Sequence, residues 1–171
     1  MVHSKRKSAE YYHEHKQTIT EIRKLYDELY KKQPFSAGYM DRSLKYFVME
    51  VTTDTVRYLY NSDRGRNQLY ETITKFKYDT SKLVSIYSKM KEIECLWLSK
   101  SSFFIEGNRE KVTYLSFKSA SSGGPFKENK YYILIFLTRP FTSPEIKKRI
   151  KRGDIVKIDE LVYFTIGNRF R

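Results

Sequence analysis

The sequence has little of several residues on which common architectures depend. Its 171 residues include one cysteine, seven glycines and four prolines. A single thiol cannot close an intrachain disulfide, which excludes a disulfide-stapled scaffold, and the low glycine and proline content excludes a fibrous or linker-like chain. The cysteine, Cys95, lies in an apolar segment. We therefore expect it to be a buried core residue rather than a reactive thiol.

Long hydrophobic runs are also missing. The longest apolar segment, residues 131–137, has the length of a strand and falls short of the roughly 20 residues that a membrane-spanning helix needs. The basic amino terminus is followed by polar residues rather than by the apolar core of a secretory signal. We therefore expect an intracellular protein, cytoplasmic by default. An organellar address is the alternative, because transit peptides are also basic.

Histidine is scarce, and all three histidines lie in the first fifteen residues. On a helix, the two-residue spacing of His13 and His15 would point their rings about 200° apart. An amino-terminal end is also a poor platform for a catalytic residue, because catalysis needs side chains held on rigid elements. We expect no metal site and no catalytic histidine here.

Other groups that could carry chemistry are equally weak. Asp154, Lys157, Asp159 and Glu160 are the nearest approach to the acid and lysine set of a metal-dependent nuclease. We interpret the two adjacent acids as a turn instead. The loop at residues 119–125, followed by Lys127, lacks the spacing of a nucleotide-binding loop. The sequence therefore predicts no enzyme and no cofactor.

Positive charge is what the chain has in excess. It contains 33 Lys and Arg against 20 Asp and Glu, a formal net charge of +13. Such a charge attracts nucleic acid, an anionic membrane surface or an acidic protein. The basic residues cluster near both ends of the chain. The candidate binding residues are Lys5, Arg6, Lys7, Arg139, Lys147, Lys148, Arg149, Lys151, Arg152, Arg169 and Arg171.

The sharpest local signal is a short cationic helix over residues 145–152. Ser143 is placed to cap it, Pro144 suits the first helical position, and Gly153 suits its end. Ile146 and Ile150 are four residues apart, so they would face the core and leave the basic side chains on the other faces. A helix of this kind can lie along phosphates.

Hydrophobic periodicity predicts an α+β fold. Three helices are expected, over residues 9–32, 41–61 and 66–92, because their apolar residues recur three and four apart. Shorter apolar runs after residue 94 indicate strands. Residues 131–137 are apolar on both faces and predict a central strand, and residues 155–166 predict a last strand or a hairpin. The expected architecture is an amino-terminal layer of three helices on a mostly antiparallel sheet of four to five strands, with one short helix before the last strand.

The expected organisation is simple. Residues 1–8 are interpreted as a mobile basic tail and residues 9–171 as a single α+β domain, with its helical part at about 9–93 and its sheet part at about 94–171. We hypothesise a non-catalytic protein that binds RNA or DNA, as an accessory or structural component of a nucleoprotein assembly. One alternative is an adaptor, inhibitor or complex subunit that docks on an acidic protein surface. Another is a small-molecule pocket between the helices and the sheet.

Aromatic side chains could add base recognition if they were exposed. Single-strand binders present rings on a sheet face, with Lys or Arg following the backbone. Six rings lie on the predicted strands: Tyr114, Phe117, Tyr131, Tyr132, Tyr163 and Phe164. We expect most of them to pack in the core, and the sequence does not separate RNA from DNA as the partner.

Overall fold

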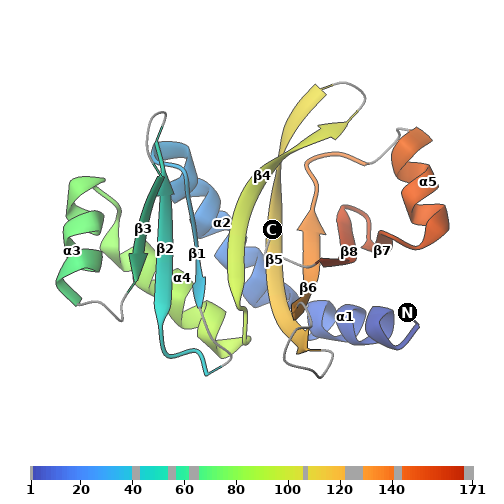
Figure 1. Ribbon diagram of the computed structural model, residues 1–171, viewed down its shortest axis with the longest axis horizontal. Coiled ribbons are helices and arrows are strands. Elements are labelled where there is room, and N and C mark those ends of the chain that lie inside the picture. Colours follow the sequence, from blue (N-terminus) through green and yellow to red (C-terminus); the bar gives the residue numbers. More distant parts are fainter. Residues whose placement is uncertain are drawn as a thin grey trace. The chain divides into compact units, whose positions relative to one another are not determined.

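The structure is a computed structural model that describes residues 2–39, 43–53, 57–61, 66–105, 108–121, 129–140 and 144–167. The chain forms two compact units. The terminal unit combines Met1–Glu14 with Ser99–Arg171, and the central unit is His15–Leu98. Each unit contains both helices and antiparallel strands (Figure 1). The predicted α+β class is confirmed. The expected layer of three helices on four to five strands is wrong, because the described residues form five helices and eight strands, three of which lie in the part expected to be helical. The prediction of a single domain stays a prediction.

The central unit is built on a pair of helices and an antiparallel sheet. Its elements are α2 (Lys16–Lys32), β1 (Phe35–Tyr39), β2 (Phe47–Thr52), β3 (Arg57–Asn61), α3 (Arg66–Lys75), α4 (Thr80–Glu92) and the start of β4 (Trp97–Ile105). Within it the strand order is β3-β2-β1-β4. The helix expected over residues 9–32 is interrupted at His15, where α1 (Val2–Glu14) ends and α2 begins. Helix α2 ends at Lys32 before Pro34, as predicted, and its apolar face is fully buried. The buried residues are Ile19, Ile22, Tyr26 and Leu29.

The helix expected over residues 41–61 is wrong in the described part, because residues 47–52 and 57–61 form β2 and β3. Both strands pair in antiparallel register, with Phe47 opposite Tyr39 and Val51 opposite Phe35. The apolar residues of this segment fit a helical stripe and an alternating strand almost equally well. The β-branched residues in it lose side-chain freedom in a helix and pack well on a sheet, which favours the strands.

The helix expected over residues 66–92 is interrupted. Helix α3 ends at Lys75, and α4 begins at Thr80. Between them Lys77 adopts a left-handed backbone conformation, with φ of 51°. The Asp79 side chain accepts a 3.1 Å hydrogen bond from the backbone N–H of Lys82 and caps α4. The apolar residues of 66–92 recur at helical spacing without a break. The local cap nevertheless starts a new helix at residue 80.

The terminal unit places a sheet between two helices. Its elements are α1 (Val2–Glu14), the rest of β4, β5 (Asn108–Ser121), β6 (Asn129–Phe136), α5 (Pro144–Arg152), β7 (Val156–Asp159) and β8 (Val162–Gly167). The strand order is β4-β5-β6-β8-β7. Residues 133–136 are buried on both faces of β6, which lies between β5 and β8. The predicted central strand is confirmed. Of the two possibilities expected for residues 155–166, a last strand or a hairpin, the structure has the hairpin of β7 and β8.

Helices α1 and α5 cover opposite faces of this sheet. On one face the Tyr11 ring stacks on Phe117 with their centroids 4.0 Å apart. On the other face Ile150 of α5 packs against a buried cluster that includes Ile133 and Ile135. The sequence predicts a mobile tail for residues 1–8, whereas residues 2–8 belong to α1 and Ser8 is fully buried. Contacts of α1 with the sheet, which the local sequence does not reveal, order this segment.

Candidate nucleic-acid interface

Helix α5 forms where the sequence predicts it. Pro144 occupies the first helical position, and Gly153 ends the helix with φ of 80°, a left-handed conformation that favours glycine. The backbone N–H of Gly153 donates to the Ile150 carbonyl, and that of Asp154 donates to the Arg149 carbonyl, each at 3.0 Å. The predicted cap, Ser143, lies outside the described residues.

One side of α5 is fixed on the sheet. Ile150 packs against the buried cluster of β5, β6 and β8, and Tyr114 packs against the same cluster. Burial raises the pKa of Tyr114, and the nearby charge of Arg149 counteracts part of that rise. Arg149 is half-buried and therefore lies toward the sheet rather than among the outward cations. The side chain of Ile146, expected to face the core, is not among those described.

The other side of α5 carries exposed cations. Lys147, Lys148, Lys151 and Arg152 are all exposed. The Arg152 guanidinium lies 3.2 Å from the Asp154 carboxylate, so this cation already has an acidic neighbour. Within the described part of the chain, no ion pair or hydrogen bond holds the three lysine ammonium groups. Lys147 and Lys151 are one turn apart, about 6 Å along the axis.

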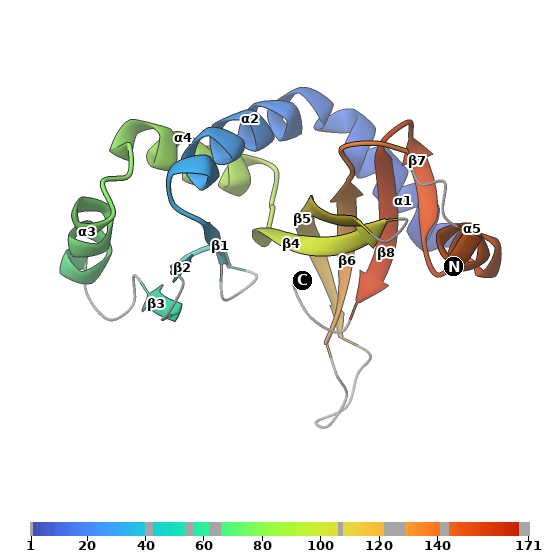
Figure 2. The same ribbon diagram turned by 90° about the horizontal axis from the view of Figure 1, so that it is seen from above.

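The remaining basic candidates are only partly available. Lys5 and Arg6 are exposed on α1, and Lys7 is half-buried. Arg6 lies 3.3 Å from Glu10 one turn later. In Figures 1 and 2 the amino-terminal end of α1 and α5 lie at the same end of the terminal unit. Arg169 and Arg171 lie outside the described residues.

Arg139 takes part in a separate hydrogen-bond network and does not belong to the exposed cations of α5. Its guanidinium donates to Glu110, whose carboxylate also accepts a 2.7 Å hydrogen bond from the Thr138 hydroxyl. The Thr138 bond, together with the hydrogen bond and charge of Arg139, lowers the pKa of Glu110. Sequence reasoning missed this partner because Glu110 and Arg139 are 29 residues apart, and no local signal connects them.

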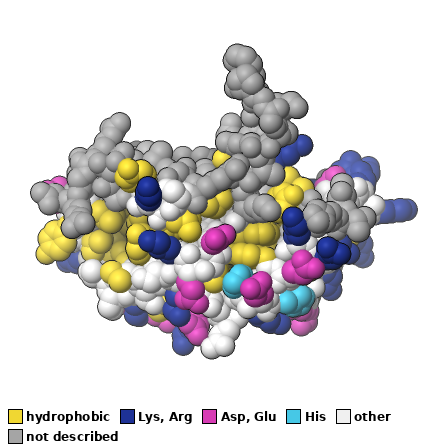
Figure 3. Space-filling view, turned by 90° about the horizontal axis from the view of Figure 1, so that it is seen from below, with side chains coloured by type: hydrophobic (Ala, Val, Ile, Leu, Met, Phe, Trp, Pro, Cys, Tyr) yellow, Lys and Arg dark blue, Asp and Glu magenta, His cyan; other side chains and the backbone are white. Residues whose placement is uncertain are grey.

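The positive charge is concentrated in the terminal unit. This unit holds 18 of the 33 Lys and Arg residues but only nine of the 20 Asp and Glu residues. Figure 3 shows several Lys and Arg side chains on the terminal unit, at the right of the view. The excess charge therefore supports an anion-binding role for this unit more than for the central unit.

The six strand rings that could have read bases serve the core instead. Phe117, Tyr163 and Phe164 are buried, and the other three are half-buried. Tyr132 makes edge-to-face contacts with both Phe117 and Phe164. Rings engaged in this way do not offer a stacking platform to bases.

The weak catalytic candidates have structural roles. Asp154 neighbours Arg152, and the Asp159 carboxylate accepts hydrogen bonds from the Tyr12 hydroxyl and from the backbone N–H of Glu160. Within the described residues, no three His, Cys, Asp or Glu side chains come together as a metal-binding group. His13 is exposed at the end of α1, and His15 immediately precedes α2.

The single cysteine is fully buried, as predicted. Burial raises the pKa of the Cys95 thiol well above its ordinary value. Its sulfur lies 3.7 Å from the carbonyl oxygen of Trp97, to which the thiol donates. A thiol in this state is a poor nucleophile. Of the loop expected at residues 119–125, residues 119–121 belong to β5 instead, and the remainder, with Lys127, lies outside the described residues.

Comparison of the chain with protein-family models, curated proteins and solved structures gave no significant match. Among the described helices, none is both long enough and apolar enough to cross a bilayer.

Proposed function

We propose that the protein binds RNA or DNA through the outward face of α5, as a non-catalytic accessory component of a nucleoprotein assembly. The observation that carries this proposal is the set of exposed ammonium groups of Lys147, Lys148 and Lys151 on a helix fixed by Ile150. A helix fixed to a sheet holds its lysines in a constant arrangement, so phosphates meet a preformed cationic surface.

Recognition in this proposal is electrostatic. Each lysine that neutralises a phosphate releases condensed counterions, which makes affinity fall as salt rises. The strand rings are packed in the core, so binding through this face carries little base discrimination. Arg6, Arg139 and Arg152 already have carboxylate neighbours and contribute less than the three lysines.

The test compares the wild-type protein with the variant K147Q/K148Q/K151Q. Labelled duplex DNA, duplex RNA and single-stranded RNA of equal length are titrated by fluorescence anisotropy at low salt. The matched control K24Q/K31Q/K32Q removes three exposed lysines from α2 in the central unit. We expect the α5 variant to lose affinity while the control retains most of it. Equal losses would show that net charge, rather than the α5 face, drives binding and would overturn the proposal.

An acidic protein partner is distinguished in the same experiment. Labelled polyglutamate with the same number of charges as the oligonucleotides is titrated in parallel. Tighter binding of polyglutamate than of every oligonucleotide would overturn nucleic-acid binding and favour docking on an acidic protein surface.

A further inference from the structure

The edge strand of the terminal unit adds a lysine to the face of the sheet that carries α5. Lys157 of the edge strand β7 is exposed, and its register partner on β8 is Tyr163. Residues directly opposite each other in an antiparallel pair point to the same face of the sheet. Tyr163 belongs to the buried cluster against which Ile150 of α5 packs. Lys157 therefore points to the α5 face, at the edge of the sheet.

The connection between α5 and β7 is held on the same face. Thr165 of β8 lies opposite Ile133, a member of that cluster, and its hydroxyl donates a 2.9 Å hydrogen bond to the Asp154 carbonyl. This bond ties the chain between the end of α5 and β7 to the sheet, and Figures 1 and 2 both show α5 beside β7. The exposed lysines of α5 and the edge lysine therefore belong to one surface. We call it the lysine surface, and it consists of Lys147, Lys148, Lys151 and Lys157.

The acids close to Lys157 in sequence leave its charge largely free. Within the described part of the chain, no ion pair or hydrogen bond holds the Lys157 ammonium. Asp154 pairs with Arg152, and the Asp159 carboxylate accepts the hydroxyl of Tyr12 from α1. Glu160, in the turn after β7, is exposed and leaves the sheet edge less positive than α5 itself.

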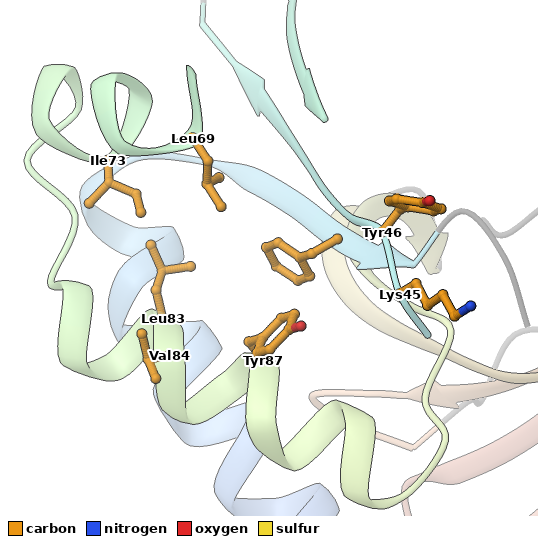
Figure 4. Close-up of a pocket in the computed structure, with 8 residues that line it drawn as sticks. Lys45, Tyr46, Leu69, Ile73, Leu83, Val84 and Tyr87 are labelled. Atoms are coloured by element: carbon orange, nitrogen blue, oxygen red, sulfur yellow. The ribbon is translucent and has the colours of Figure 1, made fainter. Parts of the chain in front are cut away.

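The terminal unit offers this surface no ring on which a base could stack, as far as its side chains are described. Its described tyrosine and phenylalanine side chains are buried or half-buried. The exposed tyrosines of the described residues, Tyr46 and Tyr70, lie in the central unit. There Tyr46 lines an open apolar groove of about 390 Å³, together with Leu69 of α3 and Leu83 of α4 (Figure 4). The exposed rings and the lysine surface thus belong to different units.

A duplex suits a surface of this kind better than a single strand does. The bases of a duplex are already stacked on one another, whereas proteins that bind single strands gain much of their affinity by stacking bases on aromatic side chains. A duplex also carries one phosphate charge per roughly 1.7 Å of its axis, about twice the density of one of its strands. It is stiff over about 150 base pairs, so it loses little conformational freedom when it lies on a fixed surface.

We propose that the ligand of the lysine surface is a nucleic-acid duplex, whose phosphates contact Lys157 as well as the three lysines of α5. This inference rests on the nucleic-acid function proposed above and adds to it the form of the ligand and one further contact residue. The chemistry that the surface recognises is the phosphate backbone of a double helix, which DNA and RNA both supply.

The form of the ligand is tested by competition for one labelled duplex bound to the full-length protein. The unlabelled competitors are a DNA duplex, an RNA duplex of the same sequence, and the separate strands of each, chosen to lack self-complementarity. We expect each duplex to displace the label at about tenfold lower phosphate concentration than its strands. The stronger of the two duplexes identifies the source as DNA or RNA. Single strands that compete as well as the duplexes would overturn the proposal.

The contact residue is tested with Lys157→Gln. Loss of one phosphate contact should flatten the slope of log K against log salt by about 0.9 for duplex binding. Lys130→Gln is the matched control, because Lys130 is an exposed lysine of β6 in the same unit. It precedes Tyr131, which packs against the cluster on the α5 face, so Lys130 points to the opposite face. The control should leave the slope unchanged, and equal slopes for the two variants would overturn the role of Lys157. Thermal unfolding checks that both variants are folded.

The same titrations separate this inference from the proposed function. If K147Q/K148Q/K151Q weakens the binding of duplexes and single strands alike, and single strands compete as well as duplexes, α5 binds nucleic acid but the duplex inference is wrong. If that variant binds every nucleic acid as the wild-type protein does, the proposed function is wrong, and the duplex inference is wrong with it.

Discussion

The Tyr12 hydroxyl donates a 3.0 Å hydrogen bond to the carboxylate of Asp159, which lies 147 residues later in the chain. This bond joins α1 to the end of β7 within the terminal unit. Tyr12 is almost fully buried, and its ring also lies near Phe136 of the sheet. The pair helps to explain why the basic amino terminus is helical and held on the sheet.

Tyr12→Phe should therefore lower the free energy of unfolding by about 1 kcal/mol, the usual net contribution of a hydrogen bond. Urea unfolding followed by circular dichroism measures the change. Tyr70→Phe is the control, because Tyr70 is exposed and its substitution should change stability by less than about 0.5 kcal/mol. Equal effects of the two substitutions would show that the bond to Asp159 does not stabilise the fold.

Gly38 has no room for a side chain. A Cβ atom at this position would lie 2.1 Å from the carbonyl oxygen of Leu96 and 2.5 Å from the Trp97 ring. Because the nearest atom belongs to the backbone immediately before β4, Gly38→Ala should destabilise the protein by about 1–3 kcal/mol or more. At Gly153 an alanine would be strained only by the left-handed backbone, so Gly153→Ala should lower the free energy of unfolding by about 1 kcal/mol. A near-neutral Gly38→Ala in urea unfolding would contradict the close pairing of β1 with β4.

Two ion pairs join α2 to α4 and predict a specific dependence of stability on pH. The Lys82 ammonium lies 2.6 Å from Glu28, and Lys89 pairs with Glu21. Hydrogen bonds from these lysines lower the pKa of both carboxyls below the ordinary value of 4.5. The stabilisation is therefore complete above about pH 4.5 and is lost as the pH falls through the lowered values.

E21Q/E28Q should consequently show a flatter decline of melting temperature on acidification than the wild-type protein. The pKa of Lys82 and that of Lys89 are raised above 10.5, so the same pairs also contribute below that pH and are lost as the pH rises further. Melting curves recorded across both ranges check the prediction. Parallel curves for the variant and the wild-type protein would show that the pairs contribute nothing, as many exposed pairs do.

Sequence patterns predicted elements whose determinants are local. Helix α5 follows from Pro144 and Gly153, and the end of α2 follows from Pro34, because these residues act within one turn of the chain. Strand β6 follows from a continuous apolar run. Residues 47–61 were harder, since their apolar positions suit either period and only pairing with β1 selects the strand.

The candidate site was predictable only in part for a similar reason. Sequence located the cations of α5, but their availability depends on partners such as Asp154 and on burial of Arg149 against the sheet. Glu110 and Arg139 meet through tertiary structure alone.

The most direct test of the account is the salt dependence of duplex binding. Wild-type protein and K147Q/K148Q/K151Q are titrated against one labelled duplex between about 50 and 200 mM salt, a range over which phosphate contacts weaken strongly. If all three lysines contact phosphates, the slope of log K against log salt should flatten by about 2.7, at roughly 0.9 per contact. Parallel slopes for the two proteins, or wild-type binding that does not change with salt, would contradict phosphate recognition by α5.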